Sequence, residues 1–83
     1  MKHDKNPVAV TVSRRLRTMM SARKMSSADI VRSCTIGSGQ ISQYFNGNAM
    51  MRADKLLELC EVLDCSADYL LGRTNDPRVA GKQ

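Results

Sequence analysis

The sequence predicts an all-α domain of five helices. Apolar residues recur at spacings of three and four, as Val12, Leu16 and Met19 do, which places them along one face of a helix. Residues typical of helix ends separate the periodic segments, such as Ser66 before the last of them and Gly72 after it. The 83 residues suffice for one small domain with a compact core.

The first helix is predicted over residues 10–23. Its apolar stripe is flanked by arginines and consists of Val12, Leu16, Met19 and Met20. Pro7 cannot occupy an interior helix position, so the helix is expected to begin after it. Residues 1–9 are therefore expected to form a flexible basic tail, and the folded domain is expected to span residues 10–72.

The second helix is short and is predicted from Ser26 or Ser27 to Cys34. Ser26 has the side chain of an N-cap, and Asp29 in the first turn complements the helix dipole. The residues expected to face inward are Ile30, Val31 and Cys34.

The third helix is predicted over residues 38–45, after the tight connection Thr35-Ile36-Gly37, and Asn46-Gly47 ends it. Only Ile41, Tyr44 and Phe45 can anchor it, and its other residues are glycine or short hydrogen-bonding side chains. Such a helix can lie in the major groove of DNA, where base edges present donors and acceptors. Together with the second helix it predicts a helix-turn-helix. A polar helix that simply faces water has the same periodicity.

The last two helices are predicted over residues 53–64 and 66–71. The stripe of the fourth helix comprises Ala53, Leu56, Leu57, Cys60 and Leu63. Ser66 caps the fifth helix, Leu70 and Leu71 are expected to point inward, and Gly72 ends it. Residues 73–83 are expected to form a flexible tail.

Charge is distributed unevenly along the chain, whose net charge is +5. Residues 1–52 contain nine basic and two acidic residues, whereas residues 53–83 contain four basic and six acidic ones. No acidic residue lies between Asp29 and Asp54. A surface without negative charge suits contact with phosphates, although an ordinary polar surface has the same composition.

The sequence lacks the residue patterns of common catalytic and metal sites. The three cysteines, Cys34, Cys60 and Cys65, and the single His3 lack the spacing of a metal site. The cysteines lie among apolar residues, which predicts buried thiols in a reducing, cytoplasmic setting. No phosphate-binding loop and no apolar run near 18 residues occurs. We therefore expect no enzyme, cofactor, small-molecule substrate or membrane segment.

Several segments resemble the Cro/repressor-type helix-turn-helix family, also called the XRE family. The resemblance spans Arg15 to Gly72 and includes all five predicted helices. The segments are Arg15-Leu16, Met25-Ser26-Ser27, Ser42-Gln43-Tyr44-Phe45-Asn46-Gly47 and Ser66-Ala67-Asp68-Tyr69-Leu70-Leu71-Gly72, with Ile36 and Ile41 at apolar positions. It implies a lambda-repressor-like fold and DNA binding through helices two and three.

The resemblance also implies a role for individual residues. The implied base readers are Ser38, Gly39, Gln40, Ser42 and Gln43, and the implied phosphate contacts are Ser27, Asn46, Asn48 and Arg52. Gln43 is the best single reader, because an amide can pair with adenine through two hydrogen bonds. Arg52 is equally compatible with a solvated residue at the start of the fourth helix.

The chain departs from the family pattern at several positions. Thr35 stands where the family commonly has glycine, and Gly37 stands where it favours a serine N-cap. Gly39 inside the third helix is expected to soften it. Met20 and Phe45 replace a partly buried Arg–Glu ion pair of many relatives, and we expect the two apolar side chains to pack together.

The predicted function is sequence-specific binding of double-stranded DNA by a transcriptional repressor. One helix-turn-helix reads few base pairs, so a homodimer on a (pseudo)palindromic operator is expected. Leu57, Val62 and Tyr69 are candidates for an exposed dimer surface, unless they complete the core. A second hypothesis is a protein-binding module, such as an antitoxin or anti-repressor, but the acid-free segment argues against it.

Overall fold

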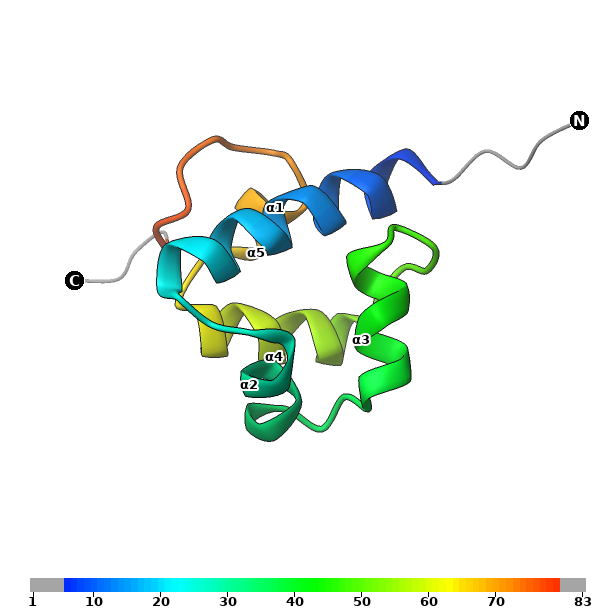
Figure 1. Ribbon diagram of the computed structural model, residues 1–83. Coiled ribbons are helices and arrows are strands. Elements are labelled where there is room, and N and C mark those ends of the chain that lie inside the picture. The colour runs from blue at the N-terminus through cyan, green and yellow to red at the C-terminus, as the bar shows by residue number, and fades with distance from the viewer. Residues whose placement is uncertain (1–5, 80–83) are drawn as a thin grey trace, which may run out of the picture.

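The computed structural model describes residues 6–79, which form five α-helices and no strand (Figure 1). The helices are α1 (Pro7–Arg23), α2 (Ser27–Ser33), α3 (Ser38–Phe45), α4 (Ala53–Leu63) and α5 (Ala67–Leu70). The all-α prediction is therefore confirmed. Figure 1 shows α1 and α4 on opposite sides of the molecule, with α3 standing across one end.

The helix α1 begins three residues earlier than predicted. Pro7 is its first residue, and the side chain of Asn6 accepts hydrogen bonds from the N–H groups of Val8 at 2.8 Å and Ala9 at 3.4 Å. A proline fits this position because the first N–H groups of a helix have no partner within it. Residues 7–9 thus belong to the helix, and Ala9 is buried. Residues 1–5 of the predicted tail lie outside the described residues.

The predicted start of α2 and both predicted ends of α3 are confirmed, whereas α2 ends one residue earlier than predicted, at Ser33, with Cys34 as its C-cap. Ser26 and Asp29 form a reciprocal capping box, in which each side chain accepts a hydrogen bond from the backbone N–H of the other. The bond from the Ser26 backbone is the largest cause that lowers the pKa of Asp29. After α3, Gly47 adopts a φ of +71°, where a side chain is strained and a Cβ atom would also lie 3.4 Å from the Cα atom of Val10.

The core lies between α1 and the other helices. Its fully buried side chains come from every helix except α3, and from the two loops before α3 and α5. They are Leu16, Ile30, Ile36, Leu59, Leu63, Cys65 and Leu70. The helix α1 contacts α3, α4 and α5, and α2 contacts α3 and α4. Cys60 and Cys65 are buried free thiols as predicted, whereas Cys34 is half-buried.

Two features of α4 and α5 differ from the sequence prediction. Leu59 is fully buried and Leu57 is 58% exposed, so the stripe predicted through Leu57 is wrong at that position. Ala53 is exposed as well. Tyr69 is only 9% exposed, because the Arg15 guanidinium lies over its ring, 4.5 Å from the ring centre. Tyr69 is therefore not part of an exposed dimer surface.

The segment after α5 is bound to the helices, in contrast to the free tail that the sequence predicts. Arg15 donates hydrogen bonds to the carbonyl oxygens of Tyr69 at 3.2 Å and Thr74 at 2.6 Å. The backbone N–H of Ser66 donates to the carbonyl oxygen of Pro77 at 2.8 Å. These bonds hold the described part of the segment, residues 73–79, against α1 and α5. Residues 80–83 of the predicted tail lie outside the described residues.

The turn between α2 and α3 is tied to α4 by a side chain. Thr35 donates its backbone N–H to one carboxylate oxygen of Glu58 at 2.8 Å and its hydroxyl to the other at 2.7 Å. Lys55 donates to the Thr35 hydroxyl at 2.8 Å. The bond from the Thr35 backbone, followed by that from its side chain, lowers the pKa of Glu58. Three hydrogen bonds thus fix the turn at the position where relatives commonly have glycine.

None of the helices within the described residues is long and apolar enough to span a membrane.

The different burial of two leucines in α4 gives a stability prediction. Leu59→Ala should lower the free energy of unfolding by about 2–5 kcal/mol, because it removes fully buried apolar atoms and leaves a cavity. Leu57→Ala is the matched control and should change it by less than about 0.5 kcal/mol. Urea denaturation followed by circular dichroism measures both changes. Equal losses for the two variants would contradict the burial pattern of α4.

The tie between Thr35 and Glu58 predicts a pH-dependent stability. Glu58→Gln should lower the Tm at neutral pH, because a carboxylate that accepts two hydrogen bonds becomes an amide with one acceptor oxygen. The pKa of Glu58 is lowered in the folded chain. Its stabilisation is therefore complete above the ordinary value of 4.5 and is lost as the pH falls through the lowered value.

Thermal melts from about pH 7 down to about pH 3 check this prediction, since the Tm difference between the wild type and Glu58→Gln should shrink in acid. Glu61→Gln is the matched control on the same helix, because its carboxylate accepts no hydrogen bond from the described residues. A Tm difference for Glu58→Gln that stays constant with pH counts against the tie.

Candidate nucleic-acid interface

The helix α3 buries one face and exposes the other. Ile41 and Tyr44 are buried, and Phe45 is half-buried against the core. The five residues that the sequence predicts as base readers are all exposed: Ser38, Gly39, Gln40, Ser42 and Gln43. With 3.6 residues per turn, Ser38, Gly39, Ser42 and Gln43 share one face, which we call the reading face, and Gln40 lies at its edge.

The side chains of the reading face have no partner within residues 6–79. No hydrogen bond joins Ser38, Gln40, Ser42 or Gln43 through its side chain to another described residue. Gly37, the N-cap of α3, has no side chain to cap the first turn, and this turn contains no acidic residue. The first N–H groups of α3 are thus open to a phosphate or another anion.

The C-terminal end of α3 is held by an arginine of α1. The Nε and Nη2 groups of Arg17 donate to the carbonyl oxygen of Phe45 at 3.1 Å and 2.8 Å. Nη2 also lies 3.5 Å from the Oδ1 atom of Asn46. A cation at this end complements the helix dipole. No local sequence pattern predicts this contact, since it joins residues 28 positions apart.

Met20 and Phe45, the two apolar residues that depart from the family pattern, lie at the same α1–α3 junction. Met20 belongs to the buried cluster of the core, and Phe45 packs against that cluster. Both side chains line one shallow surface hollow, together with Arg17 and Met25. This arrangement supports the predicted packing of Met20 with Phe45.

The predicted phosphate contacts lie around α3. Ser27 is the exposed first residue of α2, and Asn48 is exposed in the loop after α3. Asn46 is oriented by Arg17. Arg52 is the N-cap of α4, is 80% exposed and lies 3.5 Å from the carboxylate of Asp54. An exposed ion pair of this kind is weak, so Arg52 can exchange it for a phosphate.

Several arginines of the basic half stabilise the fold. Arg15, Arg17 and Arg23 all donate to backbone carbonyl oxygens, Arg23 to those of Leu63 at 2.8 Å and Asp64 at 2.9 Å. Their charge contributes to the field around the molecule, but part of each guanidinium group is engaged in these bonds. The positive excess of residues 1–52 therefore overstates the number of arginines available for phosphates.

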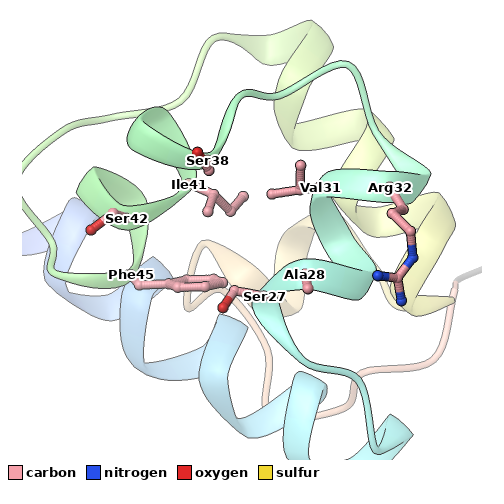
Figure 2. Close-up of a pocket in the computed structure, with 8 residues that line it drawn as sticks. All are labelled: Ser27, Ala28, Val31, Arg32, Ser38, Ile41, Ser42 and Phe45. Atoms are coloured by element: carbon pink, nitrogen blue, oxygen red, sulfur yellow. The ribbon is translucent and has the colours of Figure 1, made fainter.

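A hollow lies between α2 and α3, beside the reading face (Figure 2). It has a volume of about 490 Å³, and we call it the α2–α3 hollow. It is lined by Ser27, Ala28, Val31, Arg32, Ser38, Ile41, Ser42 and Phe45. No sequence pattern predicts this hollow, because it arises from the small side chains that two helices place opposite each other.

No group of three or more potential metal-ligating side chains gathers among residues 6–79. The arrangement offers an exposed polar helix end and face, bordered by amides, hydroxyls and the exposed arginines Arg32 and Arg52.

Comparison with known proteins agrees with this geometry. The family model of the Cro/C1-type HTH DNA-binding domain matches residues 15–76, which include the C-terminal half of α1 and all of α2 to α5. No curated protein and no solved structure matches the chain. The family match covers well over half of the chain and includes the helix-turn-helix that α2 and α3 form. The chain therefore belongs to the Cro/C1-type helix-turn-helix DNA-binding family.

Proposed function

We propose that the chain is a transcriptional repressor that binds a specific double-stranded DNA operator by inserting α3 into the major groove. The observation on which this proposal rests is the reading face, whose side chains are exposed and without partners in the described chain. Both ends of α3 lie next to side-chain ties that keep it in place, namely Glu58 at the turn and Arg17 at Phe45. Such a regulator acts in the cytoplasm, on the DNA of the nucleoid.

In this proposal Ser38, Gly39, Gln40, Ser42 and Gln43 face the bases. Gln43 has the most specific role, because its amide can donate to and accept from one adenine at the same time. Gly39 has no side chain, so it permits a close approach of the helix to the groove without contributing to the readout.

Contacts to the DNA backbone position α3 in the groove. The proposed contacts precede and follow the reading face along the chain and supply hydroxyl, amide and guanidinium donors. They are Ser27 at the start of α2, Asn46 and Asn48 after α3, and Arg52 before α4. These contacts set the register of the protein on the duplex, whereas the reading face selects the sequence.

The proposed active form is a homodimer on a (pseudo)palindromic operator, since a single α3 reads only a few base pairs. Of the three apolar candidates for its interface, Leu57 is exposed and Val62 is half-buried, while Tyr69 is buried under Arg15. Val79 lies in the same surface hollow as Leu57, which extends the apolar area on this side of α4. We therefore place the dimer surface around Leu57.

A protein-binding helix-turn-helix is the competing hypothesis, and salt dependence separates the two. Binding to DNA releases counterions from the phosphates, so the affinity should fall steeply as salt is raised. The only acidic residue of α2 or α3 is Asp29, whose carboxylate is bound to Ser26 and Arg32. This lack of available negative charge favours DNA.

The base-reading role of Gln43 is testable on a duplex selected from random DNA. Gln43→Ala should weaken binding to the selected site by about 1–3 kcal/mol and relax the preference at one base position, because one paired amide contact is lost. Fluorescence anisotropy on the selected duplex and its single-base variants measures both effects. A scrambled duplex is the control and should bind the variant and the wild type alike. An unchanged preference at every position would show that Gln43 is not a reader.

The phosphate role of Arg52 has a matched control in Arg73. Both are exposed, at 80% and 75%, and both pair with an exposed aspartate, at 3.5 Å and 3.6 Å. Arg52→Ala should weaken binding to all duplexes alike and reduce the slope of log K against log salt by about 1. Arg73→Ala removes the same charge from the segment after α5 and should leave the slope unchanged. Equal slopes for the two variants contradict a phosphate contact at Arg52.

A further inference from the structure

We infer that the α2–α3 hollow receives the C5-methyl group of a thymine, and that it makes the chain select thymine at one position of each half-site. This inference rests on the proposed function, because it requires α3 to lie in the major groove. It adds a specificity element made of apolar surface to a reading face made of hydrogen-bonding groups.

The interior of the hollow is apolar. Figure 2 shows Ile41 and Val31 pointing toward each other from α3 and α2, and the ring of Phe45 reaching toward the start of α2. Arg32 lines the edge, but its guanidinium points away from the hollow and pairs with the carboxylate of Asp29. A polar atom entering the hollow loses water and finds no charged partner there, whereas an apolar group gains contact with three apolar side chains.

The hollow opens beside the reading face. Ser38 and Ser42 belong both to the reading face and to the lining of the hollow. A base edge that contacts either serine therefore lies next to the hollow that Ile41 lines. On the other side Ser27 and Ala28 are exposed, and their small side chains leave the entrance open. Ser27 is also a proposed phosphate contact. The hollow thus lies between the groups that would touch the bases and those that would touch the backbone.

The chemistry of the major groove selects the occupant. Among the four bases only thymine presents a methyl group there, and the others present hydrogen-bond donors and acceptors. The serine hydroxyls that line the hollow can bind donors or acceptors at its edge, but Val31, Ile41 and Phe45 offer only apolar contact, which a thymine methyl group gains and the C5–H of cytosine does not. With a volume of about 490 Å³ it admits the methyl group and the ring edge that bears it without displacing a side chain.

Replacing thymine by deoxyuridine in the DNA tests the inference, because this change removes only the C5-methyl group. The protein is the full chain, and the probe is a duplex selected from random DNA, in which each thymine is replaced in turn. Affinity should fall about fourfold at one thymine of each half-site, which is the effect of burying one methylene-sized group, and should stay constant at the other thymines. If no thymine of the selected site lowers the affinity when it is replaced by deoxyuridine, the inference is overturned.

A variant that fills the hollow links the effect to this place in the structure. Ala28→Leu puts a larger apolar side chain at the entrance and keeps α2, since leucine is a strong helix former. The fourfold penalty for deoxyuridine should disappear in this variant, while the salt slope stays that of the wild type. Ala22→Leu is the matched control on an exposed site of α1 outside the hollow and should keep the penalty.

The outcomes separate the inference from the proposed function. If random DNA yields no preferred sequence at all, the proposed function fails. If it yields a preferred sequence whose affinity ignores deoxyuridine, or if Ala28→Leu retains the full penalty, only the thymine inference fails. Binding that ignores deoxyuridine is also the result expected if the hollow serves an apolar side chain of a protein partner.

Discussion

The bond between the Arg17 guanidinium and the carbonyl oxygen of Phe45 fixes the helix on which the proposed function depends. The helix α3 has eight residues, and most of them are polar or glycine. A helix of this length is marginal by itself, and only Ile41, Tyr44 and Phe45 attach it to the core. Arg17 adds two hydrogen bonds and a positive charge where the helix dipole is negative. The reading face can therefore stay polar, because the position of α3 does not depend on burying it.

Three arginines of α1 donate to backbone carbonyl groups rather than to carboxylates. Arg15 binds the segment after α5, Arg17 the end of α3, and Arg23 the end of α4. Each of these contacts joins α1 to a distant element, so α1 acts as the element that fixes the others. A net charge counted from the sequence treats these arginines as surface charge. In the folded chain their guanidinium groups hold helices and loops together. The DNA contacts proposed near α3 therefore come from amides, hydroxyls and Arg52.

The sequence predicted best what local chemistry determines. The ends of α2, α3 and α5 follow from the Ser26 capping box, the glycine after α3 and the Ser66 cap, each of which involves only near neighbours. The start of α1 was misplaced, because Pro7 fits the first helical position as well as the one before a helix. The buried leucine of α4 was misassigned, since Leu57 and Leu59 fit similar stripes until packing selects one. Arg17, Glu58 and the α2–α3 hollow were missed, because they depend on contacts between distant segments.

The Thr35–Glu58 contact changes how freely the turn can evolve. A glycine at this point accommodates the backbone by itself and leaves the residue at position 58 unconstrained. With Thr35 in the turn, two donors need the carboxylate, and the carboxylate in turn lies beside Lys55. The energetic effects of substitutions at 35 and 58 are then not additive, as is general for groups that share hydrogen bonds. We expect homologous sequences to change the two positions together. A surface position on α4 should therefore covary with a turn residue 23 positions away.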